Sequence, residues 1–132
     1  MSLKIFSHAS FKISCSALWS VSWHPFRNEL ACCGSEKIIY LLLFDQDNKL
    51  VKTINFGEKH TKTIRSSFFT KDIVVAWSPS GDYIAAASFD STVSVYFVDS
   101  DYTIDCVSII EGHENEVKCV AWDASNTFLA TC

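Results

Sequence analysis

The chain repeats one short pattern three times, and each copy is built around a tryptophan. In every copy a Leu-Ala or Ile-Ala pair begins seven residues after the tryptophan. The three pairings are Trp23 with Leu30, Trp77 with Ile84, and Trp122 with Leu129. The tryptophans lie 54 residues (77 minus 23) and then 45 residues (122 minus 77) apart. A fixed offset at such a spacing predicts a repeat architecture, in which each unit buries apolar surface against its neighbours.

Within one period the residues alternate as they do in short β-strands. In residues 92–97 one face of a pleated strand carries Val93, Val95 and Phe97, and the other carries Thr92, Ser94 and Tyr96. Residues 50–54 and 105–110 are equivalent strands, and residues 78–82 and 89–91 are turns. A succession of strands and turns over roughly 40–45 residues is typical of a four-stranded propeller blade.

Composition and charge exclude several classes of protein. The 132 residues are 48% hydrophobic and 20% charged, which excludes a disordered chain. The formal net charge of −4 argues against a general nucleic-acid binder, which needs a basic surface. The longest apolar run, residues 38–44, is far shorter than the roughly 20 residues that span a bilayer. The first residues also lack the apolar stretch of a secretory signal, so we predict a soluble intracellular protein.

The six cysteines suggest either disulfides or a metal site, but their spacing supports neither. They include no C-x-x-C pair, and Cys32, Cys33, Cys106 and Cys119 stand among apolar strand residues. Because free cysteine packs as a small hydrophobe, we predict buried, reduced thiols, with a zinc or cluster site as the alternative. Neither a catalytic motif nor a metal-ligand spacing of histidines is present. The residues therefore offer no candidate catalytic site.

The sequence resembles the WD40 repeat family. Glu111-Gly112-His113 precedes Trp122 as the Gly-His entry of that repeat does, and Asp90 and Tyr96 stand six residues apart at its turn Asp and tryptophan positions. Tyr96-Phe97 replaces the Trp-Asp signature, and His113 and Thr131 resemble members of a hydrogen-bonded network. The resemblance implies structural roles for Trp23, Trp77, Asp90, Tyr96, Gly112, His113, Trp122 and Thr131.

Longer strings are similar to one branch of this family. Residues 86–92 and 111–122 resemble the WD40 subunit of the cytosolic iron-sulfur protein assembly machinery. The resemblance implies an all-β, seven-bladed propeller that lacks a catalytic role and a cofactor. It implies a scaffold subunit of a targeting complex that helps deliver iron-sulfur clusters to apo-proteins. The implied partners are the other subunits and the client proteins, with no direct nucleic-acid or membrane contact, in the cytoplasm; a nuclear location stays open.

Two other functions remain open at this point. The shared repeat also fits a general WD40 protein-interaction adaptor, such as a ubiquitin-ligase substrate receptor. The cysteines allow a third function, direct carriage of a metal or cluster.

The repeats divide the chain into three expected parts. Residues 1–56 hold an N-terminal segment and repeat 1, residues 57–110 hold repeat 2, and residues 111–132 hold the first half of repeat 3. The spacing ahead of Trp77 predicts an insertion near residues 66–73, which is a partner-binding loop, a tolerated extension or translated non-coding sequence. Because seven repeats need about 300 residues, we expect an N-terminal fragment of two blades and half of a third.

Overall fold

The computed structural model describes residues 10, 12–13, 17–34, 38–57 and 73–132. These ranges form ten strands and no helix, so they contain no helix that could cross a membrane. The strands are β1 (Leu18–Trp23), β2 (Glu29–Gly34), β3 (Ile39–Phe44), β4 (Leu50–Phe56), β5 (Ile73–Trp77), β6 (Tyr83–Ser88), β7 (Val93–Val98), β8 (Ile104–Ile110), β9 (Val120–Trp122) and β10 (Leu129–Thr131).

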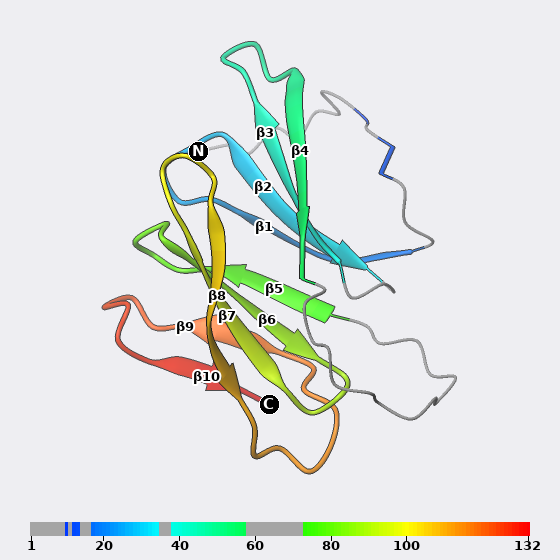
Figure 1. Cartoon of the computed structure of the whole chain (residues 1–132), viewed down its shortest axis with the longest axis vertical. Helices are drawn as coiled ribbons and strands as arrows, with labels where there is room; N and C mark the ends of the chain where they lie inside the picture. Colours follow the sequence, from blue (N-terminus) through cyan, green and yellow to red (C-terminus); the bar gives the residue numbers. More distant parts are fainter. Residues whose placement is uncertain (1–9, 11, 14–16, 35–37, 58–72) are drawn as a thin grey trace, which may run out of the picture.

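The strands form three antiparallel sheets in which each strand pairs with its neighbours in the chain. Two sheets have four strands, in the orders β1-β2-β3-β4 and β5-β6-β7-β8, and the third consists of β9 and β10. Figure 1 shows the sheets following one another in chain order, from blue and cyan through green and yellow to orange and red. Strand β5, the first strand of the second sheet, contacts both β1 and β9. We call the sheets blades 1, 2 and 3, and the predicted all-β blade architecture is confirmed.

The seven-residue offset of the sequence repeat is the register of a β-hairpin. Trp23 stands opposite Leu30, Trp77 opposite Ile84, and Trp122 opposite Leu129. The residue after each tryptophan donates its backbone amide to the carbonyl oxygen five residues later. These bonds join His24 to Glu29 at 2.8 Å, Ser78 to Tyr83 at 2.8 Å, and Asp123 to Phe128 at 3.0 Å. The same inner hairpin is therefore built three times.

Strand β7 is covered on both faces, so its alternating residues do not leave one face in solvent. Tyr96 and Val98 pack into a cluster shared with blade 1, whereas Val93 packs with Val117 and Val120 ahead of and within β9. Both faces are buried because blade 2 lies between two other blades. The other strands predicted from the sequence, residues 50–54 and 105–110, are confirmed within β4 and β8.

The main core lies between blades 1 and 2. Its largest fully buried members are Ile39, Leu41 and Ile84, and Trp77 and Tyr96 of blade 2 complete it. Phe56 of blade 1 meets Tyr96 edge-on, with ring centroids 5.1 Å apart. A single cluster therefore draws side chains from two sheets.

The prediction that the cysteines are buried is only partly right. Cys32 and Cys33 are buried in β2, but Cys106, Cys119 and Cys132 are exposed thiols. Cys106 lies on the outer strand β8, where residues 105–110 are exposed. Cys119 and Cys132 flank the strands of blade 3, which has one neighbouring blade in this chain. Apolar sequence neighbours therefore do not determine burial at the outer strand of a blade.

The predicted insertion near residues 66–73 falls almost entirely outside the described residues. Its last residue, Ile73, is the first residue of β5 and pairs with Ser88. The three-part division of the chain stays a prediction.

Replacing Leu41 with alanine should destabilise both four-stranded blades together. The side chain is fully buried in the shared cluster, and such truncations lower the free energy of unfolding by about 2–5 kcal/mol. Chemical denaturation followed by tryptophan fluorescence measures the change. The matched control is Val51→Ala on β4, where the side chain is 67% exposed and the expected change is below about 0.5 kcal/mol. Equal effects of the two substitutions would contradict a shared core.

Candidate functional site

The position after each tryptophan carries a hydrogen-bond acceptor that holds the following turn. In blade 1, His24 Nδ1 accepts the backbone amides of Phe26 at 3.0 Å and Arg27 at 2.8 Å. In blade 2, Ser78 Oγ accepts the amide of Tyr83 at 3.1 Å. In blade 3 the Asp123 carboxylate accepts three amides, from Ser125 at 3.1 Å, Thr127 at 2.8 Å and Phe128 at 2.7 Å. Three chemically different side chains therefore accept the backbone hydrogen bonds of equivalent turns.

His24 also joins blade 1 to blade 2. Because Nδ1 accepts two amide hydrogens, the neutral ring carries its hydrogen on Nε2, which donates it to the Gly81 carbonyl oxygen of blade 2, 3.1 Å away. Arg27 Nε also lies 3.0 Å from Nε2, and in this tautomer its hydrogen serves Glu29 Oε1, 3.1 Å away. The imidazole meets Trp77 edge-on with ring centroids 4.7 Å apart. A β-carbon on Gly81 would lie 2.4 Å from His24 Nε2, so glycine permits this close contact.

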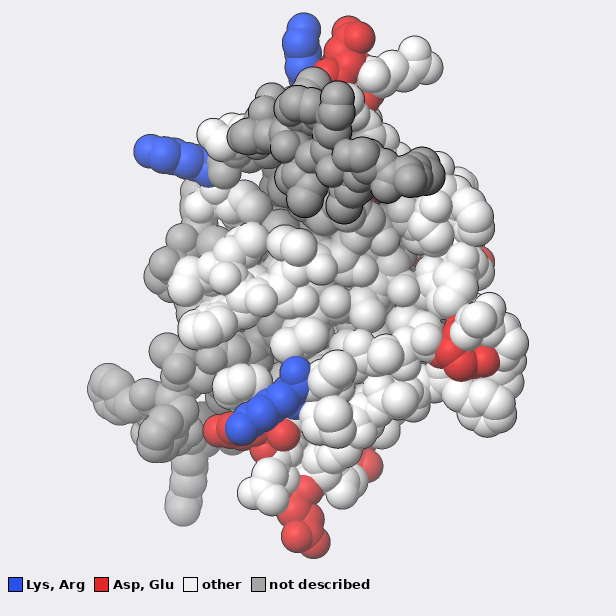
Figure 2. Space-filling view, turned by 180° about the vertical axis from the view of Figure 1, so that it is seen from behind, with Lys and Arg blue, Asp and Glu red and all other residues white. Residues whose placement is uncertain are grey.

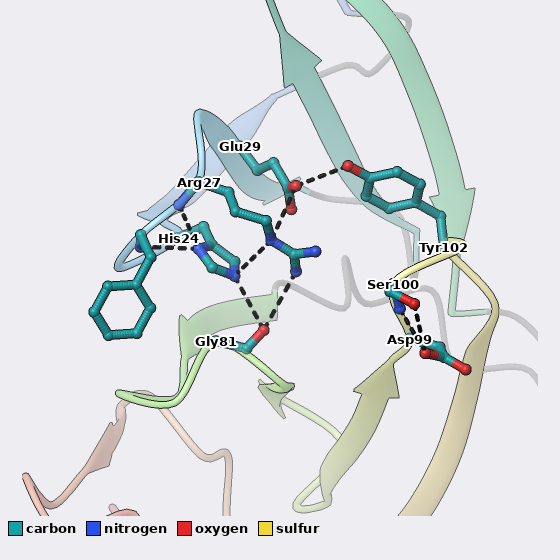
Figure 3. Close-up of polar contacts among 8 residues, drawn as sticks. His24, Arg27, Glu29, Gly81, Asp99, Ser100 and Tyr102 are labelled. Carbon is teal, nitrogen blue, oxygen red and sulfur yellow. Dashed lines mark hydrogen bonds and ion pairs between the residues drawn. The ribbon is translucent and has the colours of Figure 1, made fainter.

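A buried carboxylate makes a second contact between blade 1 and blade 2, closer to the outer strands. Glu29 is 3% exposed, and its Oε1 lies 3.1 Å from Arg27 Nε and accepts the Tyr102 hydroxyl at 2.8 Å. The Arg27 guanidinium lies 5.9 Å from the centre of the Tyr102 ring. Figure 3 shows Glu29 between Arg27 of its own blade and Tyr102 of blade 2. We call His24, Arg27, Glu29, Gly81 and Tyr102 the junction cluster.

The hairpin between β7 and β8 delivers Tyr102 to this cluster. Tyr102 has a left-handed backbone, with φ of 64°, and donates its amide to the Asp99 carbonyl oxygen at 2.9 Å. The Asp99 and Asp101 carboxylates accept the amides of Ser100 and Thr103, at 2.6 and 2.8 Å. A local turn held by carboxylates therefore sets a contact between distant parts of the chain.

The surroundings of two titratable side chains in the cluster shift their pKa values. Burial, followed by the nearby Arg27 charge, lowers the pKa of His24, and it outweighs the opposing effects of Glu29, the Gly81 carbonyl and Asp82. Burial, followed by the hydrogen bond to Glu29, raises the pKa of Tyr102. His24 is therefore neutral when the blades are joined, which agrees with its role as a double acceptor.

The chemistry of the junction cluster is that of a stabilising contact between two blades. The Glu29 carboxylate is buried and its charge is balanced by Arg27, whose side chain is 35% exposed, so loss of Arg27 would leave a buried charge without its ion-pair partner. The second oxygen of Glu29, Oε2, is buried and has no hydrogen-bond partner among the described residues. No group of three His, Cys, Asp or Glu residues in the described ranges could hold a metal ion.

The three predicted tryptophans end the inner strands but differ in burial. Trp77 is 6% exposed, whereas Trp23 is 59% exposed and lies beside Phe44, with ring centroids 5.8 Å apart. Trp122 Nε1 donates to the Ala76 carbonyl oxygen of blade 2 at 3.2 Å. Trp77 and Trp122 therefore lie at successive blade contacts, whereas Trp23 packs beside a residue of its own blade.

The other predicted positions are spread over turns and strands. Asp90 accepts the Thr92 hydroxyl at 2.6 Å in the turn before β7, and Tyr96 is buried in the main core. Gly112 has φ of 143° with open space around it. His113 Nε2 lies 2.8 Å from Thr131 Oγ1, so two of the predicted network residues are in direct contact. Their wider network stays a prediction.

The geometry of Cys32 and Cys33 argues against their acting as a pair of cluster ligands. They are consecutive residues of β2, so their side chains point to opposite faces of the sheet. Burial raises the pKa of the Cys33 thiol to about 12, with a smaller contribution from Cys32. Thiolate is the form that binds metals, and it is therefore disfavoured here.

The junction cluster was not predicted from the sequence. One signal for it existed, because His24, Ser78 and Asp123 follow the three aligned tryptophans and are all acceptors. Nothing local to Tyr102 indicates that its hydroxyl reaches Glu29, 73 residues earlier.

Replacing Gly81 with alanine should lower stability more than the same change at Gly112. Both glycines have positive φ, of 79° and 143°, but only at Gly81 would the new β-carbon meet His24. We expect the extra loss at Gly81 to be about 1–3 kcal/mol, as for other overpacked sites, measured by urea denaturation. Combining Gly81→Ala with His24→Ala should recover part of it. Equal losses at the two glycines would rule out the clash.

The free energy of unfolding should fall as the pH is lowered through about 6.5, the ordinary histidine value. The folded pKa of His24 is lowered, so below that pH the unfolded chain takes up a proton that the folded chain does not. Urea titrations between pH 5.5 and pH 7.5 measure the slope. His24→Asn keeps an acceptor and does not titrate, so its slope should be smaller; an unchanged slope would exclude His24 as the source.

Comparison with known proteins identifies a protein family whose sequence model matches this chain. The family model described as "WD domain, G-beta repeat" matches residues 48–96 and 104–132, more than half of the chain. Each matched range begins close to an outer strand, β4 or β8, and continues into the inner strands of the next blade. The crystal structure of Saccharomyces cerevisiae Sqt1 has a similar fold, with a TM-score of 0.58 and 12% identity over 80% of this chain and 25% of that chain.

Several curated relatives have names that refer to iron-sulfur assembly. A probable cytosolic iron-sulfur protein assembly protein CIAO1 homolog from Caenorhabditis elegans is 36% identical, over 96% of this chain and 36% of the relative. A probable cytosolic iron-sulfur protein assembly protein 1 from Candida glabrata is 34% identical, over 93% and 36%. A probable cytosolic Fe-S cluster assembly factor from Schizosaccharomyces japonicus is 39% identical, over 87% and 17%.

The chain therefore spans about a third or less of the length of these relatives. The match to the family model agrees with the repeated inner hairpin and with the stacking of the blades. The chain belongs to the WD40 repeat family.

Proposed function

We propose that this chain is a non-catalytic scaffold of the cytosolic iron-sulfur protein assembly machinery. In this role it docks with other subunits of a targeting complex in the cytoplasm and helps deliver iron-sulfur clusters to apo-proteins. The observation that carries the proposal is the similarity, at 34–39% identity over most of the chain, to relatives named for cytosolic iron-sulfur assembly.

The blade geometry supports a scaffold because it presents loops from rigid sheets. The shared core and the junction cluster fix blade 1 against blade 2. The turns held by His24, Ser78 and Asp123 then lie at one end of the strands, and the β8–β9 connection lies at the other end. Loops on a rigid frame bind partners without a large ordering cost.

We further propose that the β8–β9 connection is part of the partner surface. It carries Glu111, Glu114 and Glu116, all exposed, and it joins the outer strand of one blade to the inner strand of the next. Lys118 offsets part of this charge through an ion pair with Glu116 at 3.4 Å. A basic surface on a partner subunit would complement the remaining carboxylates.

Affinity purification of the tagged chain from its own cells tests the proposal. The expected result is recovery of iron-sulfur assembly subunits and apo iron-sulfur proteins, identified by mass spectrometry. Recovery of ubiquitin-ligase subunits in their place would overturn it and favour a different WD40 adaptor.

Charge reversal at Glu114 should weaken recovery of the basic partner by about twofold to fivefold, the range of an exposed ion pair. The matched control is Asp47→Lys, which makes the same change of charge in an exposed residue of the turn between β3 and β4. Recovery should be unchanged in the control. If both variants lose the partner equally, the effect comes from net charge and not from the β8–β9 connection.

A further inference from the structure

The outer strand of blade 2 is an apolar sheet edge in contact with solvent. Strand β8 is the last strand in the order β5-β6-β7-β8, and among the described strands it pairs only with β7. Six of its seven residues are exposed, and Val107 and Ile109 are 53% and 42% exposed. The backbone N–H and C=O groups along its free side therefore have no strand to pair with in the described part of the chain.

Part of this apolar surface lies on the side of β8 that faces blade 1. Ile109 stands opposite Ser94, and Cys106 stands opposite Tyr96. Ser94 and Tyr96 are two residues apart and therefore share a face of the sheet, and Tyr96 packs in the core shared with blade 1. Blade 1 has all four of its strands, yet Cys106 and Ile109 are exposed. The β8 edge is therefore open beside a four-stranded neighbouring blade.

The outer strand of blade 1 provides an internal comparison. Strand β4 has the same length and a similar register shift, since Val51 is the extra residue there as Val107 is in β8. It carries Lys52, however, and Lys49 precedes it. A lysine on an edge strand hinders pairing with another chain because its charge must stay hydrated. Strand β8 contains neither lysine nor proline, so it lacks the protection that β4 has.

Acidic side chains lie at both ends of the β8 edge. Asp101 and Asp105 are exposed near its start, and Glu111 is exposed directly after its end. Lys118 is the only Lys or Arg in residues 93–122, and it forms an ion pair with a neighbouring glutamate. Asp105 and Glu111 are six residues apart, which is about 20 Å along an extended strand. The edge is therefore acidic at both ends and apolar between them.

We propose that β8 binds an extended peptide segment of another protein by strand addition, and that this segment has Lys or Arg at both ends and alternating apolar residues between them. Main-chain hydrogen bonds to the free edge hold the segment, and its apolar side chains lie against Val107 and Ile109. Basic residues about six positions apart meet the carboxylates of Asp105 and Glu111. The inference goes beyond the proposed function and does not depend on it, because any partner with such a segment would bind.

Fluorescence anisotropy with a designed peptide tests strand addition on the full chain. The probe is a seven-residue peptide with blocked ends, a lysine at each end, and valine and threonine alternating between them. We expect saturable binding. Replacing two adjacent central residues of the peptide with proline removes a main-chain donor on each side of the strand and should weaken binding at least about tenfold. No saturable binding, or equal binding of the proline peptide, would overturn the proposal.

Substitutions on the two outer strands locate the contact. Val107→Lys places a lysine on the β8 edge and should weaken peptide binding at least about tenfold. Val51→Lys makes the same change at the register shift of β4 and should leave binding unchanged. Asp105→Asn should weaken binding about twofold to fivefold, the range of an exposed ion pair, whereas Asp47→Asn should have no effect. If the two lysine variants bind equally well, β8 is not the site.

Hydrogen exchange measured by mass spectrometry separates strand addition from a loss of folding. Bound peptide should slow amide exchange in residues 104–110, because an added strand protects edge amides, and should leave residues 50–56 unchanged. Without peptide, Val107→Lys should keep the wild-type exchange pattern, since Val107 is exposed. Slower exchange in both strands, or in neither, would contradict the proposal.

Sedimentation velocity without peptide tests the alternative occupant, a second copy of this chain. The wild-type chain and the Val107→Lys variant should sediment alike over a concentration series. If the wild type associates and Val107→Lys abolishes the association, β8 pairs with another copy and the proposed peptide partner is wrong.

Discussion

Each sheet of this chain is apolar on both faces, and the rest of the structure follows from the need to cover them. In β7, adjacent residues Val95 and Tyr96 point to opposite faces and both are buried. A sheet of this kind cannot stand alone in water, since half of its apolar surface would remain hydrated. Stability is therefore shared between neighbouring blades, as in other repeat proteins. Figure 2 shows one face of the molecule, with a broad area free of Lys, Arg, Asp and Glu side chains and most of the charged side chains around it.

Apolar burial alone does not fix how one blade is rotated against the next, and the junction cluster adds directional contacts. The Glu29 carboxylate meets the Tyr102 hydroxyl at 2.8 Å, and His24 reaches the Gly81 carbonyl at 3.1 Å. These bonds lie near the strand ends, beside the core and not within it. Buried ion pairs add little net stability compared with apolar packing. The contribution of the junction cluster is to penalise misaligned blades, which would leave the buried Glu29 carboxylate without the Tyr102 hydroxyl and His24 without the Gly81 carbonyl.

The inner hairpins could be predicted from the sequence because their signal is local. Trp77 and Ile84 are seven residues apart and directly paired, so the register is visible in the spacing. Burial of Cys106 was predicted wrongly because strand alternation does not reveal that β8 is the outer strand. The contact between Glu29 and Tyr102 depends on the rotation between two blades, which no pattern in either segment records. Properties of one hairpin were thus predictable, and properties of a contact between sheets were not.

The sequence repeat and the folded sheet are out of phase by one strand. The matched range that begins at residue 48 includes β4, which completes blade 1, and then supplies β5, β6 and most of β7 of blade 2. The consequence is mechanical. Tension on the chain cannot peel away one repeat without opening two sheets, because each repeat is hydrogen-bonded into both. Successive repeats, unlike successive blades, are therefore joined by a β-ladder, since removing the range that begins at residue 48 would break the pairing of β3 with β4 as well as apolar contacts.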